Sequence, residues 1–261
     1  HKDPFQATPS NVFRLNEIDD WMTGTLTPFA GIRVVLANHW LELKSGQQHR
    51  FWPLQPFTKR TVEDAVSFSA DHLRDSASAL LEQHSVLLSL TGGLDSRVML
   101  AACRDRIDRA RAFTIETVGD KERDLVNHLV ATSGIDHRWV PFTPPEPWIL
   151  ELYDEMTGGQ SLGSRRQVAG ACMSLSAPDL VHLSGNLGAI AKSFYWPKGT
   201  ASWPTAHMLT RDFLQRGGAI ETGAYEWLQT LPQDLAPETA SNLMYHEKRG
   251  SRWMGIGETA S

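Results

Sequence analysis

Hydrophobic and polar positions follow two different periods along the chain, and these periods predict strands and helices in alternation. Over residues 31–52, apolar residues alternate with polar ones on both sides of a Ser45-Gly46 turn, which is typical of a β-hairpin. From Thr61 to about Gln83, apolar residues recur at helical spacing. Thr61 and the acidic residues that follow it also form a helix-start signal. We therefore expect an N-terminal β-hairpin followed by an amphipathic helix.

The most informative stretch is VLLSLTGGLDSRVMLAA, which runs from Val86 to Ala102. A continuous apolar run, then two glycines, then an apolar helical repeat predicts a buried parallel strand that turns directly into a helix. Further strands are expected over residues 112–116, 137–141 and 180–183, and further helices over residues 121–132, 166–175, 211–216 and 237–248. This alternation predicts an α/β fold with a doubly wound, mostly parallel, Rossmann-like sheet covered on both faces.

Composition narrows the classes of function. Of the 261 residues, 41% are hydrophobic and 21% are charged, as in an ordinary soluble globular protein. A net charge of -5 argues against a nucleic-acid partner, because surfaces that follow a phosphate backbone need clustered Lys and Arg. No apolar stretch approaches the roughly 18 residues of a membrane helix, and no charged-then-apolar leader is present. Cys103 and Cys172 provide neither a disulfide framework nor a zinc spacing. We expect a cytoplasmic protein with no nucleic-acid or membrane partner.

The turn SLTGGLDSR after the predicted central strand has the features of a phosphate site. Gly92 and Gly93 would let the backbone approach a phosphate closely, and the amides at the start of the following helix point toward the same spot. Thr91 and Ser96 add hydroxyl donors. A carboxylate such as Asp95 fits beside an anion if a divalent cation bridges the two. The glycine spacing matches neither the Walker loop nor the dinucleotide fingerprint. The alternative is a tight strand-to-helix turn in which Asp95 and Ser96 only cap the helix.

The strand, the pattern [ST]-G-G-x-D-S and the helix together resemble the pyrophosphate loop of the N-type ATP pyrophosphatases. SLTGGLDSR is most similar to asparagine synthetase and its relatives, which include β-lactam synthetases and lasso-peptide cyclases. GIRVVLANHWLELKSGQQHRFWP resembles the hairpin by which asparagine synthetases leave their glutaminase domain. LSGNLGAI stands where the family has an L-S-G-x-G-x-D-E turn, and HEKRGSRW resembles its E-x-R element. The likeness covers roughly residues 31–253 and is strongest at the loop.

The resemblance implies an adenine nucleotide alpha hydrolase-like domain over residues 61–261, lacking its C-terminal end, after a hairpin and linker remnant of a glutaminase-like region over residues 1–60. It implies ATP and Mg²⁺ as cofactors. The residues that it places at the nucleotide are Leu90, Thr91, Gly92, Gly93, Leu94, Ser96, Ile115, Ser184 and Gly185. It makes Asp95 and Asp124 magnesium ligands and Asp95, Glu247 and Arg249 catalytic. For Ser184-Gly185, a plain strand-ending turn is the alternative.

The chain departs from the family pattern in its second turn, where acidic positions fall on Asn186, Ala189 and Ile190, none of which ligates a metal. Substitutes are available just beyond the second strand of the sheet, at Glu116, Asp120, Glu122 and Asp124, of which Asp120 and Asp124 are preferred. A charged helix start that is only solvated is the alternative. The resemblance also leads us to expect a segment with a catalytic lysine after the E-x-R element, and no lysine follows Lys248 in residues 249–261.

The reaction that the family performs is attack of a substrate carboxylate on the α-phosphorus of ATP. Pyrophosphate leaves, and an amine captures the resulting acyl adenylate. The sequence therefore favours an AMP-forming amide ligase without a glutaminase domain, with a small-molecule or peptide carboxylate as substrate. The amine would come from free ammonia, a substrate or a partner chain. The alternative is a catalytically impaired nucleotide-binding or partner-binding module. A sulfur-transfer or RNA-modifying relative would need paired cysteines and a basic face, which the sequence lacks.

Overall fold

The computed structural model describes residues 23–27, 31–116, 119–142, 144–157, 172, 175, 177, 179–186, 188–196, 202–210 and 218–254, with only the backbone of residues 249 and 252–254. The helices expected over residues 166–175 and 211–216 lie outside these residues, apart from Cys172 and Leu175. The rest forms two compact units. Unit 1 holds the described parts of 1–58, 152–166 and 189–260, and unit 2 those of 59–151 and 167–188. The chain thus passes from unit 1 to unit 2 near the expected boundary at residue 60, and residues from 189 onward group with the N-terminal segment.

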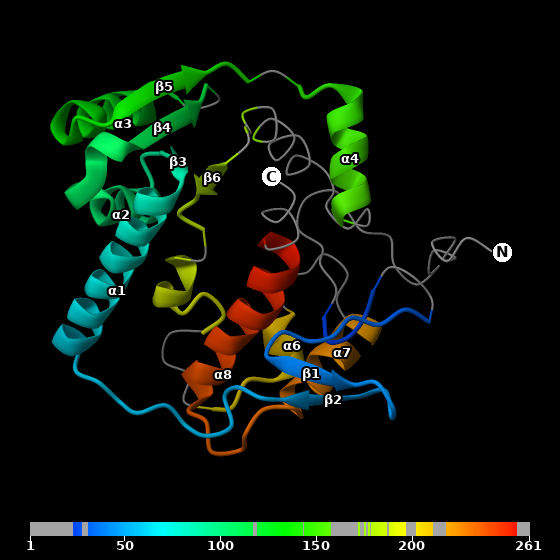
Figure 1. The fold of residues 1–261 in the computed structure, drawn as a ribbon. Coiled ribbons are helices and arrows are strands. Elements are labelled where there is room, and N and C mark those ends of the chain that lie inside the picture. Colours follow the sequence, from blue (N-terminus) through cyan, green and yellow to red (C-terminus); the bar gives the residue numbers. More distant parts are fainter. Residues whose placement is uncertain are drawn as a thin grey trace. The chain divides into compact units, whose positions relative to one another are not determined.

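Unit 2 is an α/β unit built on a four-stranded sheet in which every neighbouring pair of strands is parallel (Figure 1). The strand order is β5-β4-β3-β6. Its elements are α1 (Val62–Gln83), β3 (Ser85–Ser89), α2 (Leu94–Ala102), η1 (Arg104–Arg109), β4 (Ala110–Ile115), α3 (Asp120–Ser133), β5 (Asp136–Val140) and β6 (Leu180–Leu183). Helix α4 (Pro147–Thr157) and the short helix η2 (Gly188–Lys192) contain the points at which the chain passes between the units. The predicted parallel α/β sheet with flanking helices is confirmed.

One face of this sheet forms the core of unit 2 with helices α1, α2 and α3. Val86 and Leu88 of β3 are at most 1% exposed and pack in one cluster with Leu81 of α1, Leu100 of α2 and Val126 of α3. The predicted start of α1 is confirmed, because the Thr61 hydroxyl accepts a hydrogen bond from the Asp64 amide at 3.1 Å. Burial of this apolar face is what holds the three helices against the strands.

Unit 1 combines an antiparallel strand pair with a small helical core. Strands β1 (His39–Glu42) and β2 (Gln47–Arg50) pair across a turn in which Gly46 has a positive φ of 71°. The helical elements are α6 (Ala206–Leu209), α7 (Gly218–Leu228), α8 (Pro237–Met244) and η3 (Tyr245–Met254), which is a π-helix. Trp227 of α7 and Met244 of α8 are fully buried in the shared core. The expected helix over residues 237–248 is therefore α8 and the beginning of η3.

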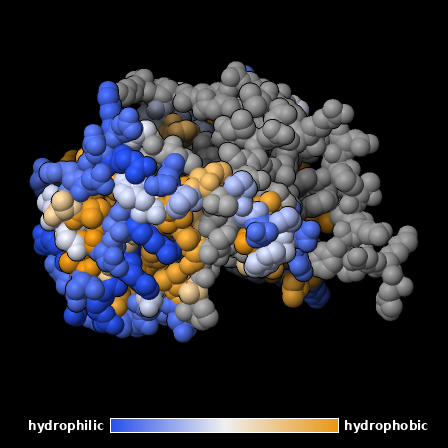
Figure 2. All heavy atoms as spheres, turned by 90° about the horizontal axis from the view of Figure 1, so that it is seen from above, coloured by the Kyte–Doolittle hydropathy of each residue, from blue (hydrophilic) through white to orange (hydrophobic). Residues whose placement is uncertain are grey.

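The surface carries hydrophobic side chains among hydrophilic ones. On the face seen in Figure 2, hydrophilic residues surround patches of hydrophobic ones over the left-hand coloured part of the molecule. Exposed large hydrophobic residues in unit 1 include Trp40, Leu43 and Leu54. Among the helices that the structure describes, none has both the length and the hydrophobicity needed to cross a membrane.

A buried ion pair connects the strand pair of unit 1 to its helices. The carboxylate of Glu247, in η3, pairs with the guanidinium of Arg50, in β2, and the two side chains are 0% and 5% exposed. The second oxygen of Glu247 accepts from Arg50 Nη2 and from the indole nitrogen of Trp227, both at 2.8 Å. Asn38 Nδ2 donates to the first oxygen at 2.9 Å. Four donors from three segments of the chain therefore meet at one carboxylate.

We predict that Glu247→Gln destabilises unit 1 by about 3 to 5 kcal/mol, because the variant leaves the Arg50 guanidinium buried opposite a neutral group. Urea unfolding, followed by intrinsic tryptophan fluorescence, measures this change. The matched control is Glu221→Gln, which removes the exposed contact with His207 and is expected to cost less than about 1 kcal/mol. Equal stability of the two variants would contradict a central role for the buried pair.

Candidate functional site

The strand order of unit 2 is enough to locate the candidate site. Strands β3, β4 and β5 follow one another to one side of the sheet, whereas β6 lies on the other side of β3. The order therefore reverses between β3 and β6. In open parallel sheets, ligands bind beyond the carboxyl ends of the strands at such a reversal. The turn after β3 begins at Leu90 and the turn after β6 begins at Ser184, so both predicted turns lie at this point.

Hydrogen bonds within the turn after β3 hold it in a fixed shape. The Ser96 hydroxyl, which is in the first turn of α2 and 6% exposed, accepts from the Thr91 amide at 3.1 Å and donates to the Thr91 carbonyl at 2.9 Å. The Thr91 hydroxyl accepts from the Gly93 amide at 3.1 Å. Arg97 Nε donates to the Gly93 carbonyl at 3.2 Å. Thr91 and Ser96 therefore brace the turn, and their predicted contacts with phosphate stay predictions.

A carboxylate from α3 binds the first glycine of this turn. The Gly92 amide donates to Glu122 Oε1 at 3.1 Å, and a Cβ on Gly92 would stand 3.2 Å from Glu122 Cγ. An amide that binds an anionic oxygen in this way shows that the turn can hold negative charge. The sequence offered Glu122 only as one of several acids, since a contact across thirty residues leaves no local signal.

The other acids near the turn differ from Glu122 in their surroundings. Asp120 and Asp124 are exposed on α3. Glu116 forms an ion pair with Arg123 at 3.6 Å. Asp95 is half-buried in the first turn of α2. Among the residues that the structure describes, no group of three or more His, Cys, Asp or Glu side chains is arranged to hold a metal ion. The magnesium sites expected at Asp95 and Asp124 stay predictions.

Glycines in the turn after β6 bring its backbone against the start of α2. A Cβ on Gly185 would stand 2.5 Å from the Ser96 nitrogen and 2.7 Å from the Asp95 carbonyl carbon. A Cβ on Gly188 would overlap the Asp95 carboxylate. Contacts this short are possible only without a side chain. The structure therefore brings together the predicted residues Ser96 and Gly185, which are far apart in the sequence.

The strand ends beside the turn are fixed through their main chains. The Leu90 amide donates to the Phe113 carbonyl at 2.9 Å, and the Leu90 carbonyl accepts from the Thr114 hydroxyl at 2.6 Å. Because that hydroxyl proton is used, the Thr114 oxygen accepts from His137 Nε2 at 2.9 Å, and this sets the histidine tautomer. Burial lowers the pKa of His137, so its ring is neutral at pH 7. Ile115 ends β4 and pairs with Val140.

The remaining predicted site residues lie away from these contacts or outside the residues that the structure describes. Leu94 is exposed at the start of α2, and Ser184 is half-buried after β6. Glu247 belongs to unit 1, where Arg50, Asn38 and Trp227 surround its carboxylate. The side chain of Arg249 lies outside the described residues. The catalytic roles of Glu247 and Arg249 stay predictions.

A scan against models of known protein families finds no match for this chain. A search of curated proteins likewise returns no significant match. Membership of the asparagine-synthetase-like ATP pyrophosphatases therefore stays a prediction from the motifs.

We predict that Gly185→Ala destabilises unit 2 by about 1 to 3 kcal/mol, because the new methyl group must displace the backbone of Asp95 and Ser96. Thermal unfolding measures the change. Gly119→Ala is the control, since Gly119 has a φ of -75° and a Cβ there would meet nothing within 4 Å. The close approach would be disproved if both variants melted at the temperature of the parent.

Proposed function

We propose that unit 2 binds the phosphates of magnesium ATP at the turn from Thr91 to Ser96, as the catalytic domain of an AMP-forming amide ligase. The observation that carries this proposal is the position of the turn at the reversal of strand order, with the Gly92 amide already bound to a carboxylate oxygen. A phosphate oxygen needs the same kind of donor. The likeness of SLTGGLDSR to the pyrophosphate loop supplies the identity of the ligand.

The residues present fit a nucleotide with a divalent cation. Gly92 and Gly93 add no side chain to the turn, and the hydroxyls of Thr91 and Ser96 are within the same turn. Asp95 and Glu122 would hold the magnesium ion, because they are the acids whose side chains contact the two turns. The metal would neutralise phosphate charge. This assignment moves the second metal ligand from Asp124 to Glu122.

Catalysis of this reaction class depends on positioning and on charge neutralisation more than on covalent participation of the protein. A substrate carboxylate oxygen would attack the α-phosphorus and pyrophosphate would leave. An amine would then displace AMP from the acyl adenylate to form an amide. The chain would contribute a fixed turn that aligns the triphosphate, and its internal hydrogen bonds mean that little ordering of the turn is left for the binding step.

A nucleotide-binding module without ligase activity is the second candidate, and Asn186 and Ala189 in the second turn favour it. Pyrophosphate exchange separates the two candidates. If the chain is a ligase, radiolabel from pyrophosphate should enter ATP in the presence of magnesium and one member of a panel of carboxylic acids. Saturable ATP binding without exchange for any acid would support the module.

We predict that Asp95→Asn weakens the binding of magnesium ATP by about 5-fold to 150-fold, which corresponds to about 1 to 3 kcal/mol for a charged partner. Calorimetric titration with ATP at saturating magnesium measures the change. Asp105→Asn is the control, because Asp105 is in unit 2 but on the exposed helix η1. Unchanged affinity in Asp95→Asn would remove the assignment of the turn as a phosphate site.

We predict that Glu122→Gln reduces the dependence of ATP affinity on magnesium, whereas Asp124→Asn leaves it unchanged. The glutamine oxygen can still accept from Gly92, so the variant removes the charge and keeps the hydrogen bond. Titrations with ATP at several magnesium concentrations measure this dependence. If Asp124→Asn reduced the magnesium dependence and Glu122→Gln did not, the second metal ligand would be Asp124, as the sequence predicts.

A further inference from the structure

The second face of the sheet in unit 2 is polar over its amino-terminal half. Sheets made only of parallel strands are normally apolar on both faces. β4 and β5 instead alternate, and their exposed members Arg111, Asp136 and Arg138 project from the face opposite to α1, α2 and α3. Neighbouring β3 presents Leu87 on the same face. This combination of charge and apolar surface is not needed for the core.

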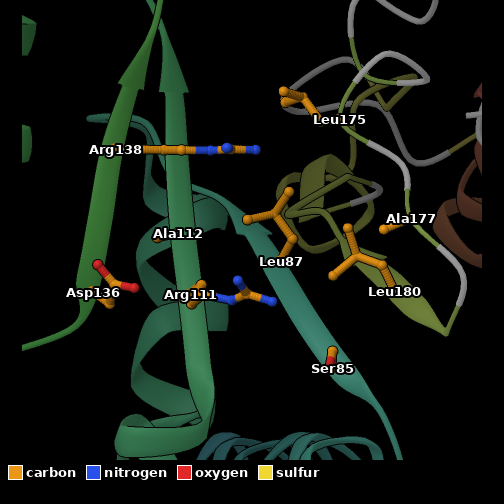
Figure 3. A pocket seen from close by; sticks show the side chains of 9 residues that line it. All are labelled: Ser85, Leu87, Arg111, Ala112, Asp136, Arg138, Leu175, Ala177 and Leu180. Carbon is orange, nitrogen blue, oxygen red and sulfur yellow. The ribbon is translucent and has the colours of Figure 1, made fainter.

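A cavity of about 350 Å³ opens over this polar face. Its walls include the charged residues Arg111, Arg138 and Asp136 and the apolar residues Leu87, Leu175 and Leu180. Figure 3 shows that both guanidinium groups extend from their strands toward the side on which the leucines lie. The volume is at the small end of the range of roughly 300 to 1,000 Å³ that is usual for ligand pockets.

The two arginines of the cavity outnumber its one lining carboxylate, that of Asp136. Arg111 is directly opposite Asp136 in the strand register, yet its guanidinium points away from that carboxylate (Figure 3). Within the part of the chain that the structure describes, neither Arg111 nor Arg138 forms an ion pair. Arg106 and Arg123 of the same unit do pair with carboxylates. The cavity therefore offers unused cationic hydrogen-bond donors.

We propose that this cavity binds a small organic anion, a carboxylate or phosphate carried on a short apolar body. Arg111 and Arg138 hold the anionic group, because guanidinium groups match the planar oxygens of carboxylates and phosphates. The apolar body lies on Leu87, Leu175 and Leu180. The site is separate from the nucleotide turn, because the strand residues that line it are the first to third residues of their strands, whereas the turn follows the last residue of β3. It therefore does not depend on the proposed function.

Calorimetric titration of the whole chain with four probes tests the proposal. Benzoate and phenyl phosphate are expected to bind saturably at one site, and whichever binds more tightly identifies the anionic group. Benzyl alcohol, which lacks the charge, and inorganic phosphate, which lacks the ring, are expected to bind at least about 10-fold more weakly. Failure of both aromatic anions to bind would overturn the proposal.

Arg111→Gln and Arg138→Gln are each expected to weaken binding of the better probe by at least about 10-fold. Arg104→Gln, an exposed arginine of η1 in the same unit, is the matched control and should leave the affinity unchanged. Asp95→Asn should also leave the affinity for the probe unchanged. The anion proposal and the ATP proposal can therefore fail independently of each other. Binding that is equal in the parent and in both arginine variants would overturn the proposal. If Arg111→Gln lowers the melting temperature, the affinity of Arg138→Gln decides whether the proposal holds, because Arg138 is on the edge strand β5.

Discussion

The candidate site of unit 2 depends on one close approach between two backbones. The turn after β6 passes so near the start of α2 that a Cβ on Gly185 would stand 2.5 Å from the Ser96 nitrogen. This contact joins the ends of β3 and β6, which flank the reversal of strand order. Without it, the two predicted turns would not share one site. Glycine is required here because of space, and not because of an unusual backbone angle.

The close approach also explains why so much of the turn is fixed internally. With the β6 turn against it, the start of α2 has little room to adjust, and Ser96 and Thr91 bind the loop amides and carbonyls that remain. Glu122 takes the Gly92 amide. A phosphate that takes the Gly92 amide from Glu122 would exchange one anion for another and would leave the Glu122 carboxylate to the proposed metal. Binding would then not need to order a loose loop.

Local patterns in the sequence predict the parts of the fold that depend on neighbouring residues. The apolar run before Gly92 predicts β3, and Thr61 predicts the start of α1, because both signals lie within one turn or strand. Contacts between distant segments leave no such signal. The bond from Gly92 to Glu122 spans thirty residues, and the bond from Trp227 to Glu247 joins a helix to a π-helix that the periodicity did not predict. The HEKRGSRW motif predicts a catalytic role for Glu247. In the structure its carboxylate is buried among hydrogen-bond donors from distant segments, which no local pattern indicates.

The alternation in β4 and β5 carries information that the prediction of a sheet covered on both faces did not use. β3 has a continuous apolar run and is buried on both sides, whereas residues 111, 136 and 138 alternate with buried or half-buried ones and are exposed. A strand that alternates in this way has one face free of core packing. The same sheet thus presents donors for an anion at both ends of its strands: backbone amides and hydroxyls beyond the carboxyl ends, and two guanidinium groups near the amino ends. Amides and hydroxyls are neutral, whereas guanidinium groups are charged. Binding near the amino ends should therefore weaken more steeply with salt than binding at the proposed nucleotide turn, apart from the contribution of a proposed metal.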